Sequence, residues 1–127
     1  MPVTGFNIIF RRCLAGGKSF GNVGPYEEIR GTLSFAIDPH HEANEAITDV
    51  TLASRNSEEE VEFSSDISII KPVNDSKSSG RMLLDVVNRG IAVGVPNFNR
   101  TSRLMVDNNT SLDDQGSVGD GFLMDMG

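Results

Sequence analysis

The segment Val61-Glu-Phe-Ser-Ser-Asp-Ile-Ser-Ile-Ile-Lys-Pro-Val73 alternates apolar and polar residues over most of its length. A period of two residues is typical of a β-strand with one buried face. Polar turns at 56–60 and 74–80 bound the segment on both sides. It therefore predicts a strand at 61–73 and indicates a fold dominated by β-structure.

Two segments upstream of this strand also have strand character. Apolar residues recur at alternate positions from Ile29 to Ile37, and Asp38-Pro39 ends the pattern, because proline cannot donate a hydrogen bond to a neighbouring strand. Ile47–Ala53 is rich in β-branched residues, which favour strands. The sequence thus predicts strands at 29–38 and 47–53.

The segment Arg81–Asn88 is different because it is apolar almost throughout. Only Asp85 interrupts the run Met82-Leu-Leu-Asp-Val-Val87. Continuous apolar runs are typical of strands covered on both faces, as in the middle of an α/β sheet. This run predicts a fourth strand at 81–88 and places the chain in the α/β class.

The remaining segments are expected to be irregular. Residues 1–28 form a Gly-rich leader of turns with a short extended segment at Phe6–Phe10, and residues 29–90 hold the strands. Residues 91–127 form a long loop followed by a short helix at Gly121–Met126, for which Asp120 would be the N-cap. At 127 residues, the chain is expected to form a single domain.

Composition narrows the classes of function. The net charge of −7, from 18 acidic and 11 basic residues, disfavours nucleic acid as a partner. No apolar run is long enough to span a membrane, and no convincing signal peptide precedes Arg11-Arg12, so a cytoplasmic location is the default expectation. Cys13 is the one cysteine, which excludes an intramolecular disulfide and a cysteine-based zinc site.

Gly17-Lys-Ser-Phe-Gly21 matches the Gly-x-Ser-x-Gly pattern of the nucleophile elbow. That motif needs a sharp turn between a buried strand and a helix, and neither neighbouring segment has that character. The two histidines, His40 and His41, lie just after Asp38 in what reads as an exposed turn. Ser19 is therefore expected to be a turn residue, and no catalytic residue is assigned.

Phosphate and metal sites are also disfavoured. A phosphate loop would need Gly six positions before Lys18, where the chain has Arg12. Oxygen ligands for calcium occur in the C-terminal loop but lack the spacing of an EF-hand, and they are Asp107, Asn109, Asp113, Asp114 and Asp120. We expect no cofactor and no metal ion.

Asn88-Arg89-Gly90 follows directly on the most apolar predicted strand. Open α/β sheets bind ligands at the carboxyl ends of such strands, and glycine lets a backbone N–H approach a ligand closely. An ordinary turn at the end of a strand explains the same residues equally well. From spacing alone, the two interpretations remain open.

Several blocks of sequence, taken in order, carry a resemblance. They are Gly16–Glu27, Arg30-Gly31, Asp38-Pro39, Ala43-Asn44, Val61–Ser64 with Asp66, Lys71–Val73, Val87–Gly90 and Gly119–Leu123. In this order they resemble the N-terminal region of a bacterial family of α/β-hydrolase domain-containing proteins. The resemblance covers about Gly16 to Gly127.

The resemblance implies that the chain is an N-terminal fragment of a longer, esterase-like hydrolase and forms the β-dominated part of its sheet. Its partner would be the remainder of the hydrolase chain, C-terminal to Gly127, with the nucleophile, acid and histidine and a small carboxylic ester as substrate. Asn88, Arg89 and Gly90 would then belong to the oxyanion loop that follows strand three. The alternative is a free-standing β-rich binding or structural domain without enzymatic activity. Fold alone does not identify a substrate.

Overall fold

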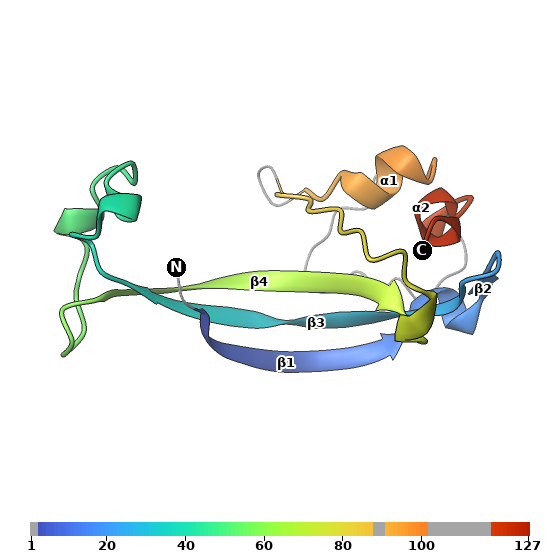
Figure 1. Ribbon diagram of the computed structural model, residues 1–127, viewed down its shortest axis with the longest axis horizontal. Helices are drawn as coiled ribbons and strands as arrows, with labels where there is room; N and C mark the ends of the chain where they lie inside the picture. Colours follow the sequence, from blue (N-terminus) through green and yellow to red (C-terminus); the bar gives the residue numbers. More distant parts are fainter. Residues whose placement is uncertain (1–2, 88–90, 102–117) are drawn as a thin grey trace. The chain divides into compact units, whose positions relative to one another are not determined.

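The computed structural model describes residues 3–87, 91–101 and 118–127 (Figure 1). Four strands form one sheet: β1 at Val3–Cys13, β2 at Ser19–Phe20, β3 at Gly24–Ile37 and β4 at Val61–Pro72. Two short α-helices are described, α1 at Gly94–Phe98 and α2 at Phe122–Asp125. Single 3-10 turns occur at η1 Leu14–Gly17, η2 Glu42–Asn44, η3 Val50–Leu52 and η4 Asp75–Lys77.

β3 is the central strand of this sheet. It pairs with β1, with β4 and, at its start, with the short β2 (Figure 1). The β2–β3 pairing is antiparallel, with Ser19 opposite Pro25 and Phe20 opposite Gly24. The tight turn between them is closed by a bond from the Val23 N–H to the Phe20 carbonyl at 3.1 Å.

The predicted α/β class is wrong. The described chain is a mostly antiparallel sheet with two short helices, and it lacks the alternation of strands and helices that an α/β hydrolase fold requires. The helices themselves show this, because α1 has five residues and α2 four, well below the three to four turns of an average helix in a globular protein. The prediction of a β-dominated chain is confirmed.

The predicted strands at 29–38 and 61–73 are confirmed as parts of β3 and β4. The strand predicted at 47–53 is wrong, because the segment forms η3, preceded by Asp49 in the left-handed region at φ 59°. The leader prediction is also wrong over Val3–Cys13, since β1 extends well beyond the short segment expected there. The C-terminal helix is confirmed at α2. Its predicted N-cap is wrong, because Gly121 and not Asp120 occupies that position, although Asp120 Oδ1 accepts a bond from the Phe122 N–H at 3.1 Å.

The strand predicted at 81–88 is wrong over its described part. Residues 81–87 belong to no strand, and every one of them is exposed. A strand that is apolar on both faces is stable only when both faces are covered. The described residues do not supply that cover.

The chain divides into two compact units. The first unit comprises the chain up to Phe10 together with Ile29–Ser68. Its core is small, and its buried members are Ile37, Val50 and Val61, with Ala53 packed against them. The rings of Phe35 and Phe63 stack at a centroid distance of 4.9 Å across β3 and β4.

Gly31 permits a close approach of strands in the first unit. A Cβ atom at Gly31 would lie 2.4 Å from the Asn7 carbonyl oxygen and 2.6 Å from the Phe6 ring. The ring of Phe6 therefore occupies the space that a side chain on β3 would need. Only glycine fits there without a shift of β1.

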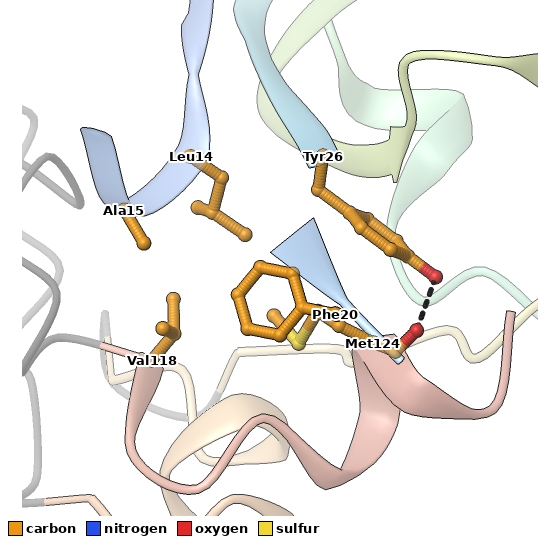
Figure 2. Packing of buried hydrophobic residues seen from close by; sticks show 6 residues of the cluster. All are labelled: Leu14, Ala15, Phe20, Tyr26, Val118 and Met124. Carbon is orange, nitrogen blue, oxygen red and sulfur yellow. Dashed lines mark hydrogen bonds between the residues drawn. The ribbon is translucent and has the colours of Figure 1, made fainter. Parts of the chain in front are cut away.

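The second unit comprises Arg11–Glu28 and Ile69–Gly127. Its buried cluster draws on segments about a hundred residues apart in the sequence, and its members are Leu14, Ala15, Phe20, Tyr26, Val118 and Met124 (Figure 2). Phe20 and Tyr26 meet edge to face at 5.7 Å. The Tyr26 hydroxyl donates to the Met124 carbonyl oxygen at 2.9 Å, which joins β3 to α2 (Figure 2).

Candidate functional site

Ser19, the serine of the Gly-x-Ser-x-Gly match, lies in β2 and is exposed. The chain runs from β2 through a turn into the strand β3, not into a helix. The strand–turn–helix geometry that lifts a nucleophile out of a sheet is therefore absent at this position. The Lys18 ammonium lies 5.4 Å from the centroid of the Phe20 ring, so this lysine covers an aromatic side chain.

The two histidines form turns. The His40 backbone N–H donates to Asp38 Oδ1 at 2.8 Å, and His41 Nδ1 accepts from the Ala43 N–H at 3.1 Å at the start of η2. His41 Nδ1 thus satisfies a backbone donor, as an N-cap side chain does. Both histidines belong to the first unit and Ser19 to the second.

The described residues form no metal centre. Within 3–87, 91–101 and 118–127, no group of three or more His, Cys, Asp or Glu side chains is arranged to hold a metal ion. Asp120 lies 3.9 Å from Arg100 and also receives the Phe122 N–H. The other predicted oxygen ligands, Asp107, Asn109, Asp113 and Asp114, lie outside the described residues, as do the oxyanion candidates Asn88, Arg89 and Gly90.

One hollow in the first unit lies in the loop between β3 and β4. It has a volume of about 480 Å³ and is lined by Pro39, His40, Glu45 and residues 47–52. Ile47 and Leu52 contribute exposed apolar surface to the lining. Neither of the carboxylates in the lining, Glu45 and Asp49, forms an ion pair with His40 among the described contacts.

A run of exposed apolar side chains is the most unusual feature of the second unit. We call Met82–Val87 the apolar segment. The exposed fractions of its apolar residues are 87% for Met82, 57% for Leu83, 73% for Leu84, 80% for Val86 and 53% for Val87. Large contiguous apolar surfaces of folded proteins occur at interaction sites, in ligand-binding grooves and in aggregation-prone segments.

Asp85 anchors the apolar segment to α1. Its Oδ2 accepts hydrogen bonds from the Val93 N–H at 3.0 Å and the Gly94 N–H at 2.7 Å. These N–H groups lie at the start of the helix, where they have no acceptor within the helix itself. A Cβ atom at Gly94 would lie 2.9 Å from this oxygen, so glycine allows the close approach. The one polar residue of the apolar segment therefore fixes its backbone and leaves the apolar side chains in solvent.

Residues near Gly80 hold the start of the same segment. The Ser79 N–H donates to the Gly127 carbonyl oxygen at 2.9 Å, and the Ser79 hydroxyl contacts the same oxygen. The Arg81 N–H donates to Ser79 Oγ at 3.3 Å. The apolar segment is thus attached at its beginning and in its middle.

Asn99 organises the C-terminal part of the second unit, and the sequence did not single it out. Its side chain is fully buried; Nδ2 donates to the Val118 carbonyl oxygen at 2.9 Å, and Oδ1 accepts the Leu123 N–H at 2.9 Å. Its own carbonyl oxygen accepts the Asp120 N–H at 2.9 Å. The residue is hard to find in an Asn-rich segment, because a buried asparagine and a solvated one look alike in sequence.

Charged residues on three strands form a second network in this unit. Arg12 Nε and Nη2 lie 3.1 and 2.9 Å from Oε2 of Glu28, whose side chain is fully buried. Lys71 contacts Glu27 at 3.3 Å, and its hydrogen bond to Asp75 raises the pKa of the ammonium.

The pKa of the Tyr26 hydroxyl is raised above its ordinary value of 10.0. Burial is the larger cause, and the nearby Asp125 carboxylate is the smaller one.

Comparison with known proteins identifies no relative. No family model matches the chain, no curated protein matches it, and no solved structure matches it. None of the helices in the described part of the chain is long and apolar enough to cross a membrane. Function must therefore be argued from the residues themselves.

Proposed function

We propose that the chain is the non-catalytic N-terminal portion of an esterase-like hydrolase and that the remainder of that hydrolase covers its apolar segment. The observation that carries the proposal is the exposure of Met82–Val87, where five apolar side chains are each more than half exposed. Fully burying a side chain of this size stabilises a protein by about 1.5–3 kcal/mol. Another polypeptide that covered the segment would bind with a large apolar contribution.

The ordered blocks of sequence give the proposal its chemical class. Two of them, Gly16–Glu27 and Gly119–Leu123, supply residues that meet in the second unit. A Cβ atom at Gly121 would lie 2.7 Å from the Phe20 ring, so these two blocks pack together only because position 121 is glycine. A packing requirement of this kind explains why both blocks occur in one chain.

The chemistry in this proposal belongs to the remainder of the hydrolase. Asn88, Arg89 and Gly90 follow the apolar segment and would supply backbone N–H groups that stabilise the oxyanion formed from a small carboxylic ester. Ser19 would have no part in the reaction, because it lies on β2 before a turn into another strand and not at a strand–turn–helix elbow. The isolated chain is then expected to be inactive.

The test extends the chain into its downstream coding sequence and measures hydrolysis of an activated short-chain ester. The extended protein should be active and the 127-residue chain inactive. Gly90→Val should lower turnover about 10²–10³-fold, since that is the usual cost of losing one oxyanion donor. Ser19→Ala should leave the rate unchanged, and the melting temperature controls for folding.

Cover of the apolar segment can be tested separately. Backbone amides of Met82–Val87 should exchange with solvent far more slowly in the extended protein than in the 127-residue chain. Leu84→Lys should destabilise the extended protein, whereas Leu52→Lys should not, although Leu52 is similarly exposed, at 80% against 73% for Leu84. Equal effects of the two substitutions, or fast exchange in both proteins, would contradict the proposal.

A free-standing β-rich binding or structural domain is the second candidate. The antiparallel sheet favours it, because the described chain lacks the alternating helices of a hydrolase core. A stop codon directly after Gly127, with a folded and inactive product, would decide for this candidate. A reading frame that continues into a strand and a later Gly-x-Ser-x-Gly would decide for the hydrolase.

A further inference from the structure

The two outer strands of the sheet differ in charge. Among the described strands, β1 and β4 each pair only with β3, so each has one edge along which no other described strand pairs. Exposed edges recruit further strands unless charged side chains or prolines oppose it. Whether an edge is protected can therefore be read from its residues.

The β4 edge is protected within the first unit. Val61–Ser68 carries Glu62 and Asp66 and no basic residue. Pairing two β4 strands would bring four carboxylates together, and like charges on paired strands are destabilising. Neither carboxylate is isolated, since Glu62 accepts from Asn56 at 3.0 Å and Asp66 from Thr32 at 3.2 Å, but both contacts leave the negative charge in place.

The β1 edge has no such protection. Its part in the first unit, Val3–Phe10, contains no charged residue and no proline. Its exposed apolar side chains include Val3 at 55%, Ile8 at 48% and Ile9 at 64%. An uncharged strand rich in β-branched and aromatic residues is typical of segments that pair with copies of themselves.

We propose that β1 is a self-association surface, on which a second copy of this chain adds its own β1 in antiparallel orientation. A two-fold axis makes such a contact self-complementary and closed. With Asn7 on the axis, Asn7 faces Asn7 and Phe6 faces Ile8 of the other copy. This register places an aromatic residue opposite a β-branched one twice, a favourable cross-strand pair, and brings no like charges together.

A second copy fits this edge better than the β4 edge of a neighbouring molecule would. A β1–β4 contact is not self-complementary, so it would leave a free edge at each end and grow into open fibres. The β1–β1 contact consumes both unprotected edges and leaves only the acidic β4 edges outside. The inference does not depend on the proposed function, since it concerns β1 and not the apolar segment.

The first experiment measures mass in solution by sedimentation equilibrium on the 127-residue chain. The chain should form a dimer of twice its 13.7 kDa mass. Asn7→Lys places two ammonium groups opposite each other on the axis and should raise the dimer dissociation constant about tenfold or more. Ser64→Lys, at an exposed position on β4, is the matched control and should leave the dimer unchanged.

The second experiment tests the register by cross-linking in a Cys13→Ser background. Paired residues in antiparallel strands have Cα atoms about 4.5–5.5 Å apart, within the range that a disulfide spans. Asn7→Cys should therefore form an intermolecular disulfide readily. Thr4→Cys should not, because the two copies of residue 4 would lie about 20 Å apart.

Three results would overturn the proposal. One is a monomer at every accessible concentration. Another is a dimer that Ser64→Lys weakens as much as Asn7→Lys does. The third is equal cross-linking at positions 4 and 7, which would indicate non-specific aggregation.

Discussion

The two units of this chain are stabilised in different ways. The first unit has a buried cluster of three apolar residues, Ile37, Val50 and Val61, and otherwise relies on strand pairing and the Phe35–Phe63 stack. The second unit buries six residues in one cluster and adds directed hydrogen bonds from Tyr26 and Asn99. Strand pairing needs only local alternation of residues, whereas the second unit depends on particular side chains brought together from distant segments.

The largest expected effect is in the core of the second unit. Leu14 is fully buried. Leu14→Ala should lower the free energy of unfolding by about 2–5 kcal/mol, through lost burial and the cavity left behind. Denaturant unfolding measures the change. Leu52→Ala at an exposed position is the control, and an equally small effect at both positions would contradict the packing described for this unit.

Asn99→Ala should follow closely in size. The substitution leaves the Leu123 N–H and the Val118 carbonyl without their side-chain partner. Each unsatisfied buried group costs about 1–3 kcal/mol, so a loss of about 3 kcal/mol is expected. Asn97→Ala, on an exposed helix position nearby, should change stability little. Hydrogen exchange should show the loosening in α2.

Gly31→Ala tests the close packing of β1 against β3 in the first unit, again by its effect on the free energy of unfolding. The added Cβ would meet the Asn7 carbonyl oxygen at 2.4 Å, so β1 must shift. Overpacking of this kind costs about 1–3 kcal/mol. Gly5→Ala is the matched control within β1, because its Cβ would have ordinary contacts with Ser34 at 3.7 Å. Similar stability of the two variants would show that the strands approach less closely than described.

Tyr26→Phe should have the smallest effect, about 1 kcal/mol from one lost hydrogen bond. It should also change the alkaline limb of the stability profile. The pKa of Tyr26 is raised in the folded protein above its ordinary 10.0, so the unfolded chain loses this proton first. The stability that Tyr26 contributes is complete below pH 10 and declines as the pH rises through the folded pKa.

Unfolding measured across this alkaline range checks the sign. The wild-type chain should lose more stability above pH 10 than Tyr26→Phe does. If the two proteins lose stability equally above pH 10, ionisation of Tyr26 does not contribute to the pH dependence of stability. The difference between them below pH 10 gives the contribution of the hydrogen bond to Met124 alone.

Local patterns in the sequence determined the strands whose pairing needs one buried face. The alternation in Val61–Val73 and in Ile29–Ile37 became β4 and the second half of β3. Period-two patterns are reliable there because adjacent side chains point to opposite faces whatever the rest of the fold does. The same local information failed at 47–53, where β-branched residues form η3, because strand propensity depends on available partners.

Only the tertiary structure decided the rest. The hydrogen bond from Tyr26 to Met124 joins residues 98 positions apart, and the bond from Leu123 to Asn99 joins residues 24 positions apart. Local sequence patterns of a few residues cannot predict either bond. Met82–Val87 is a second example of a segment whose structure the local sequence did not predict. Its apolar composition predicted a strand covered on both faces, but a strand forms only against a partner, and none of the described segments occupies that place. Composition indicates which strand a segment could form, while the contacts available in the folded chain decide whether that strand forms.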